Sequence, residues 1–186
     1  MTARGTSELL AIPNLLSISR ALLVIPFVAV MLSSRPDARF WGAAIMVAAA
    51  ITDKLDGLLA RRFGEETEWG RILDPLADKV AAGSVALVLL VLNQIPLWFV
   101  LAVLGRDLLI VAGGMYAKAR TGVILPSNET GKWAMGVLTA ALFALVVNAP
   151  RWVGDMLMTA GGIMLAVSLF LYASRFRKVM KESLPG

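Results

Sequence analysis

The sequence contains neither cysteine nor histidine. Without cysteine, the chain can form no disulfide and no cysteine-ligated zinc site. Without histidine, no imidazole is present to act as a general base, so any metal site must be built from oxygen ligands. Charged residues are also scarce, at 17% of the chain against 58% hydrophobic residues. The few carboxylates in apolar surroundings are therefore the residues to examine first.

Apolar residues are too many for a soluble domain of this size. The chain has 186 residues and a mean hydropathy of +0.75. That length corresponds to one domain, whose interior cannot hide so much apolar surface from water. Lipid must therefore solvate much of the surface, which predicts an integral membrane protein. The net charge of +5 is interpreted as basic residues at a membrane face, with no nucleic-acid partner.

The sequence predicts an all-α integral membrane protein with six transmembrane helices. The apolar stretches, each of roughly the 20 residues that span a bilayer, cover about 15–32, 40–60, 70–92, 95–116, 132–147 and 152–172. Turn-forming residues separate them at 34–37, 93–96 and 148–150. We expect residues 1–186 to form a single transmembrane domain, with residues 1–14 as an N-terminal interfacial segment.

Basic residues predict the orientation of these helices. If both termini are cytoplasmic, the cytoplasmic face carries Arg4, Arg61, Arg62, Lys118, Arg120, Lys132, Arg175, Arg177, Lys178 and Lys181. The opposite face then keeps Arg35, Arg39 and Arg151. This asymmetry agrees with the positive-inside rule, so both termini are predicted to be cytoplasmic.

Four aspartates lie within the second and third apolar stretches. Asp53 and Asp56 are spaced i, i+3, and Asp74 and Asp78 are spaced i, i+4, so each pair shares one helix face. Charges at such depth cost at least about 2.5 kcal/mol each on insertion scales, so they indicate a function. Asp53 and Asp78 each lie eight residues, or about 12 Å, from the cytoplasmic end of their helix. Two facing helices would make a site of oxygen ligands for Mg²⁺ or Mn²⁺ just beneath the cytoplasmic surface.

The spacing of these residues resembles a family signature. The pattern D-x-x-D-G-x-x-A-R-x8-G-x3-D-x3-D, which begins at Asp53, is similar to that of the CDP-alcohol phosphatidyltransferases, and every fixed position is met. Residues 12–20, Ile-Pro-Asn-Leu-Leu-Ser-Ile-Ser-Arg, resemble the opening of the phosphatidylglycerophosphate synthase and cardiolipin synthase branches. The resemblance implies a membrane enzyme that uses CDP-diacylglycerol as donor, a small alcohol as acceptor, and two divalent cations. It also implies a homodimer in a bacterial inner membrane, with the active site facing the cytoplasm.

The resemblance also assigns roles to the aspartates. Asp53, Asp56 and Asp74 would hold one cation, and Asp53, Asp74 and Asp78 the second. Asp78 would in addition take the proton of the acceptor hydroxyl as general base. Contacts to CDP-diacylglycerol carried over from similar proteins fall on Asn14, Gly57, Arg61 and Thr67.

The acceptor is the open part of the prediction. Arg106, Arg120 and Lys132 would form a cationic pocket for a phosphorylated acceptor, and Gly131-Lys132 resembles the Gly-Lys of phosphatidylglycerophosphate synthases. The following Trp133 and Met135 depart from the usual Lys-Thr pair of those enzymes. A simpler interpretation is that Arg120 and Lys132 anchor the cytoplasmic face.

The sequence therefore favours transfer of a phosphatidyl group from CDP-diacylglycerol to glycerol 3-phosphate, with release of CMP. Phosphatidylglycerol (as in cardiolipin synthases), an inositol phosphate, serine, and choline or ethanolamine with changed donor roles remain alternative acceptors. A cation transporter that binds its ion with the four aspartates is the alternative from another class. Arg20 has two interpretations, a substrate contact or a side chain that reaches for the membrane surface.

Overall fold

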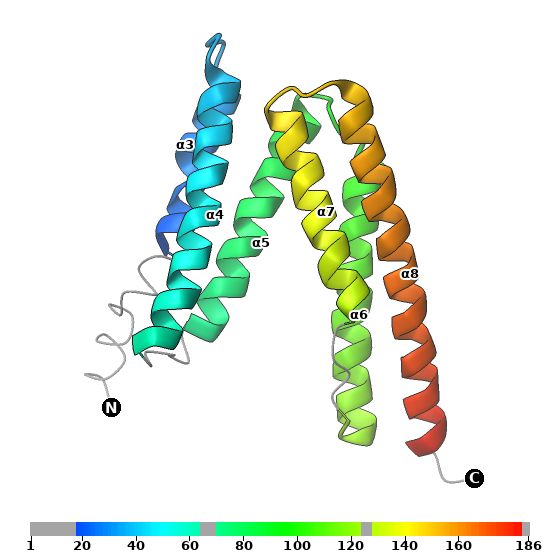
Figure 1. Ribbon diagram of the computed structural model, residues 1–186. Helices are drawn as coiled ribbons and strands as arrows, with labels where there is room; N and C mark the ends of the chain where they lie inside the picture. Colours follow the sequence, from blue (N-terminus) through cyan, green and yellow to red (C-terminus); the bar gives the residue numbers. More distant parts are fainter. Residues whose placement is uncertain (1–17, 64–69, 124–127, 184–186) are drawn as a thin grey trace. The chain divides into compact units, whose positions relative to one another are not determined.

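The computed structural model describes residues 18–63, 70–123 and 128–183, and these residues form helices and short connections with no strand (Figure 1). Six helices carry labels: α3 (Val24–Met31), α4 (Ala38–Phe63), α5 (Gly70–Val91), α6 (Leu97–Thr121), α7 (Glu129–Val146) and α8 (Arg151–Ser183). The prediction of an all-α protein is thereby confirmed for the described part. The chain divides into two compact units, residues 1–92 with 146–148, and 93–145 with 149–186.

In the first unit, α3 packs against α4 and α5. A helical segment, residues 18–22, precedes α3 and is separated from it by Leu23. Pro26 explains the interruption, because it has no N–H for the carbonyl of Leu22 and its ring crowds that carbonyl. Phe27 and Met31 of α3 are buried. Gly42 lets α4 approach closely, since a Cβ there would lie 2.5 Å from the sulfur of Met31.

An ion pair orders the turn before α4. Arg35 donates to both carboxylate oxygens of Asp37, at 3.0 and 2.9 Å, and the Trp41 indole donates to Asp37 at 2.8 Å. The Arg35 hydrogen bond, followed by that of Trp41, lowers the pKa of Asp37 to about 2. Asp37 therefore remains ionised throughout the neutral range, and this exposed turn does not respond to physiological changes in pH.

In the second unit, α8 follows a seven-residue pattern. Its buried residues are Gly154, Met158, Gly161, Leu165, Ser168 and Tyr172, at alternating steps of four and three. Such spacing forms a continuous seam along a helix that packs lengthwise on its neighbours. A Cβ on Gly154 would lie 2.6 Å from Leu145, and one on Gly161 would lie 2.5 Å from Leu138. The two glycines therefore let α7 and α8 pack closely, while α6 packs against α8.

Two of the described helices are long and apolar enough to cross a membrane, Leu97–Thr121 and residues 151–181 of α8. The apolar helical stretch Ile18–Met31 is shorter. Many large apolar side chains of α6 are exposed on the protein surface, among them Leu101, Leu104 and Leu108. This distribution fits solvation by lipid and agrees with the composition.

Most helix boundaries lie within three residues of the predicted stretches, and α6 and α8 extend further at their C-terminal ends. Helix α6 continues five residues beyond Tyr116, and α8 continues eleven residues beyond Tyr172. Hydropathy detects where apolar residues stop, but a helix can continue into polar surroundings. Helix α7 begins at Glu129 instead of near residue 132, because the side-chain oxygen of Asn128 accepts from the N–H of Gly131 at 2.9 Å. Asn93 and Asn148 adopt positive φ at the predicted turns.

Candidate active site

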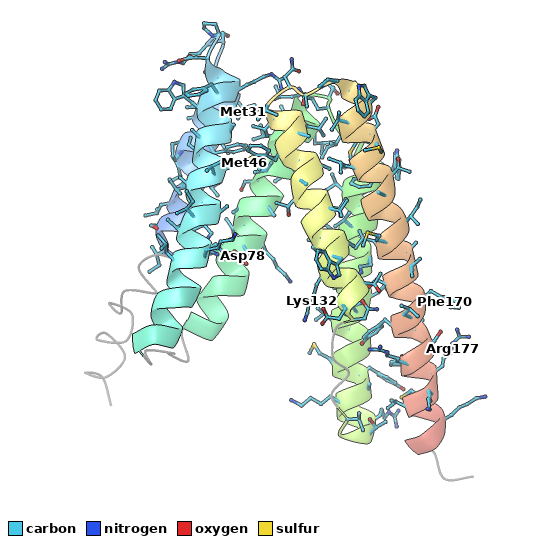
Figure 2. All side chains as sticks on the ribbon, in the orientation of Figure 1. Met31, Met46, Asp78, Lys132, Phe170 and Arg177 are labelled. Carbon is cyan, nitrogen blue, oxygen red and sulfur yellow. The ribbon has the colours of Figure 1, made fainter. Side chains whose placement is uncertain are left out.

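The predicted carboxylates lie on two helices of the first unit. Asp53 and Asp56 belong to α4, and Asp74 and Asp78 belong to α5. The structure describes the side chains of Asp53 and Asp78 (Asp78 is labelled in Figure 2). The side chains of Asp56 and Asp74 lie outside the described part of the structure. The cage of four aspartates therefore stays a prediction, and two of its members can be placed.

Asp53 and Asp78 converge on a single cationic group. One guanidinium nitrogen of Arg20, Nη1, lies 2.8 Å from Oδ1 of Asp53 and also donates to Oδ1 of Asp78. Two oxygens that contact the same nitrogen atom are close enough to share one cation. The packing of α3 on both α4 and α5 holds this arrangement, because Arg20 lies in the helical segment that leads into α3.

The side chain of Arg20 is buried between the two aspartates. Its side chain is 3% exposed, whereas those of Asp53 and Asp78 are 51% and 57% exposed. A side chain that reached for the membrane surface would expose its charge, and the Arg20 guanidinium instead lies buried between two acids. A buried charge is stable only when it is paired and hydrogen-bonded, so Arg20 depends on the carboxylates. The membrane-anchor interpretation of Arg20 is wrong, and its contact with substrate stays untested.

The donor set present fits a hard divalent cation. The described side chains include no group of three or more acidic residues that could hold a metal ion. The side chains of Asp56 and Asp74 are not among those described. The two placed carboxylates come from α4 and α5, and both contact the same guanidinium nitrogen of Arg20. Carboxylate oxygens are the ligands that Mg²⁺ and Mn²⁺ prefer.

The residues predicted to contact CDP-diacylglycerol lie outside this description. Asn14 and Thr67 are not among the described residues. Gly57 and Arg61 belong to α4, one turn and two turns beyond Asp53, but nothing is described of their side chains. Their assignments therefore stay predictions.

The predicted acceptor residues lie in the second unit in three different environments. Arg106 of α6 is mostly buried; it donates to Asp107 at 2.8 Å and to Ser168 of α8 at 2.5 Å. Lys132 of α7 is exposed and pairs with Glu129 at 2.8 Å, and Arg120 lies 5.7 Å from the centroid of the Tyr116 ring. Among the described contacts, none joins these three basic side chains to one another, so their convergence on an acceptor stays a prediction.

A buried polar network around Arg106 is the feature that sequence reasoning missed. Ser168 donates to the side-chain oxygen of Asn128 at 2.6 Å, and the Asn128 amide donates to the Ser168 carbonyl at 2.8 Å. Gly131 leaves room for the network, because a Cβ at this position would lie 2.6 Å from Nη2 of Arg106. The network connects α6, the first turn of α7 and α8. Asn128 could have been recognised as a helix cap before an acidic first turn, whereas nothing local marks Ser168.

Comparison with known proteins identifies the family. The model of the CDP-alcohol phosphatidyltransferase family matches residues 10–173, which include both placed aspartates and Arg20. The chain belongs to this family. Its match extends through both units of the structure, so the CDP-alcohol phosphatidyltransferase features are not confined to the aspartate helices.

Several relatives carry more specific names. A probable phosphatidylglycerophosphate synthase of Mycobacterium tuberculosis is 34% identical over 168 residues, covering 88% of this chain and 79% of the relative. A CDP-diacylglycerol–glycerol-3-phosphate 3-phosphatidyltransferase of Bacillus subtilis is 31% identical, covering 75% of this chain and 78% of the relative. A putative cardiolipin synthase of Mycobacterium bovis is 34% identical, covering 77% of this chain and 65% of the relative. All three names fall within phosphatidyl transfer, so the similarity supports an enzyme of this class.

Proposed function

We propose that this chain transfers the phosphatidyl group of CDP-diacylglycerol to glycerol 3-phosphate, forming phosphatidylglycerophosphate and releasing CMP. The observation that carries the proposal is the convergence of Asp53 of α4 and Asp78 of α5 on the Arg20 guanidinium, within the segment that the family model matches. Relatives named for this reaction match across most of the chain. A cation transporter is not supported by any of these relatives.

The aspartates have distinct roles in the proposed reaction. Asp53, Asp56, Asp74 and Asp78 hold two divalent cations, Mg²⁺ or Mn²⁺, consistent with the general divalent-cation dependence of the family. When bound, such ions polarise the diphosphate and offset the charge of the leaving nucleotide. Asp78 accepts the proton of the acceptor hydroxyl. At the same time, the oxygen of that hydroxyl forms a bond to the phosphorus that bears diacylglycerol. The bond from that phosphorus to the oxygen of CMP breaks in the same displacement.

The remaining residues bind the two substrates. Asn14, Gly57, Arg61 and Thr67 contact the cytidine diphosphate group, and the guanidinium of Arg61 pairs with its charge. Arg106, Arg120 and Lys132 bind the phosphate of glycerol 3-phosphate. The exposed positions of Arg120 and Lys132 support this role, since their charges are accessible to a water-soluble acceptor. The buried Arg106 has further guanidinium donor capacity beyond its bonds to Asp107 and Ser168.

We further propose that residues 1–186 form one domain with six transmembrane helices in a bacterial inner membrane, as a homodimer with cytoplasmic termini. The family match across both units supports a single domain. Trp41, Trp98 and Trp152 support the orientation. Each lies exposed in the first turn of α4, α6 or α8, the helix end that the predicted topology assigns to the outer interface, where tryptophan is enriched.

An acceptor panel with purified protein tests the function. CDP-diacylglycerol is incubated with Mg²⁺ and glycerol 3-phosphate, phosphatidylglycerol, an inositol phosphate or serine, and labelled lipid products are separated. We expect release of CMP and a new lipid with glycerol 3-phosphate, and loss of both in excess EDTA. Product with phosphatidylglycerol alone would instead make the chain a cardiolipin synthase, in line with the relative from M. bovis. No release of CMP with any acceptor would contradict the enzyme class.

A further inference from the structure

The buried contact between Arg20 and two predicted metal ligands has a consequence for metal binding. Nη1 of Arg20 lies 2.8 Å from Oδ1 of Asp53 and donates to Oδ1 of Asp78. A guanidinium that occupies these oxygens is a positive charge in the position where the signature requires a cation. A divalent cation bound to the same oxygen atoms would compete with the guanidinium for them, and the two positive charges would repel each other.

Arg20 is well placed to act as such a competitor. It comes from the segment before α3, whereas the proposed metal ligands come from α4 and α5, so the competing charge and the ligands belong to different helices. Its burial keeps the charge beside the site and away from water. Without a cation, the aspartates would repel one another across the helix interface, and a guanidinium relieves that repulsion.

We propose that Arg20 is a positioning residue that holds Asp53 and Asp78 together in the metal-free protein and is displaced when divalent cations bind. This inference rests on the proposed metal-dependent function. After displacement, the Arg20 charge lies beside the bound cations and is available to the anionic diphosphate of the donor lipid. The apparent metal affinity therefore includes the work of displacing Arg20, so the resting enzyme stays assembled but binds metal less tightly than its carboxylates alone would.

Direct metal binding tests this competition without turnover. Free Mn²⁺ is measured by its paramagnetic resonance signal during titration of the purified protein in detergent, with no substrate present. For Arg20→Met we expect tighter Mn²⁺ binding than in the wild type, by about five- to 150-fold, the usual range of coupling between linked sites. The Arg20→Lys variant, which keeps the charge but loses the fork of donors, should lie between them. Unchanged or weaker binding by Arg20→Met would overturn the proposal.

Arg39→Met is the matched control. Arg39 lies on α4 fourteen residues before Asp53, about 21 Å along the helix, so its removal deletes one positive charge of the same unit away from the site. Its Mn²⁺ affinity should equal that of the wild type. If Mn²⁺ affinity rises equally in both variants, the cause is the change in net charge, and the proposed role of Arg20 is overturned. If the wild type binds no Mn²⁺, the proposed metal site and this inference fail together.

A second measurement uses the wild-type chain and does not depend on the folding of a variant. Phenylglyoxal modifies accessible arginine side chains, and mass spectrometry reports the extent of modification at each position. Arg20 should react slowly in EDTA and several times faster in saturating Mn²⁺, whereas the exposed Arg151 should react equally in both. An Arg20 rate that does not change with Mn²⁺ would show that the guanidinium stays between the carboxylates and would overturn the proposal.

Discussion

At the scale of single residues, the two placed aspartates differ in what their loss should do. In the proposed assignment Asp53 is shared by both cations, whereas Asp78 binds one and also accepts the acceptor proton. Both side chains contact Arg20, so both variants lose one partner of the same buried cation. The difference between the variants therefore reports ligation and proton transfer rather than the ion pair.

Asp53→Asn should lower metal affinity, donor binding and turnover together. Asp78→Asn should leave CDP-diacylglycerol binding largely intact at saturating Mg²⁺, while kcat falls by at least about 10²-fold, the usual effect of a lost general base. The measurements are donor affinity and single-turnover rates of both variants. Near-normal turnover in Asp78→Asn would exclude it as the base and leave bound solvent or a substrate phosphate as proton acceptor.

The basic residues of the second unit allow a test of the acceptor pocket. Arg120→Ala or Lys132→Ala should raise the KM for glycerol 3-phosphate much more than that for CDP-diacylglycerol. Loss of one charge-assisted contact to a phosphate costs about 1.5–3 kcal/mol, or roughly 10- to 150-fold. Arg151→Ala serves as control, because Arg151 is also exposed and paired, with Asp155, but belongs to the first turn of α8. Unchanged acceptor kinetics in Arg120→Ala and Lys132→Ala would make these residues membrane anchors.

How much of the site could be predicted depends on whether the signal is local. The aspartates share short fixed spacings, so the sequence alone indicates that Asp53 and Asp78 belong to one site. Arg20 contacts an aspartate 58 residues away, and no spacing reveals that pairing before the helices are packed. Ser168 was missed for the same reason, since its partner Asn128 is 40 residues away. Side-chain contacts between helices require the packed structure.

At the scale of elements, helix α8 carries a seven-residue pattern that hydropathy alone does not reveal. Its buried positions alternate at steps of four and three, and glycine occupies two positions of the seam that faces α7. In lipid, close approach of helices depends on small residues because van der Waals contact replaces the hydrophobic effect. Hydropathy predicted where α8 begins, whereas its extension beyond Tyr172 and the face that it buries depend on its surroundings.

Gly161→Ala should destabilise the protein by about 1–3 kcal/mol, the usual cost of overpacking, because the new Cβ would lie 2.5 and 2.8 Å from two atoms of Leu138. Gly162→Ala is the matched control, since its Cβ would make an ordinary contact with Phe99 at 3.6 Å. Both variants gain the same helix propensity, so the difference isolates packing. The measurement is the thermal unfolding midpoint in detergent. Equal midpoints would show that α7 and α8 are not closely packed at this position.

At the scale of the whole molecule, the six-helix prediction requires both termini on one side of the membrane. The described residues form helices α3 to α8, and two of these helices are long and apolar enough to cross a membrane. Helices α4 and α5 are long enough to cross, but the motif places several charged residues within them. Function thus obscures the signal by which a membrane helix is recognised.

An epitope tag at either terminus should be digested by protease from the cytoplasmic side only. The physical reason is the clustering of Lys and Arg at the ends of α6 and α8 that would lie there, among them Lys118, Arg120 and Lys181. Tagged protein in inverted and right-side-out vesicles provides the comparison. A tag reached from the outer side at one terminus alone would require an odd number of spans, and at both termini would reverse the orientation.

The seam of α8 also determines which substitutions this helix can accept during evolution. At Gly154 and Gly161 even one added carbon meets a neighbouring side chain, whereas Ile163, Val167 and Phe170 are exposed and can be exchanged for other apolar residues. Drift in this helix is therefore restricted to stripes: one face changes freely with the lipid around it, and the other keeps small residues at intervals of seven. Lineages that differ widely in overall sequence should retain this seven-residue spacing of small residues.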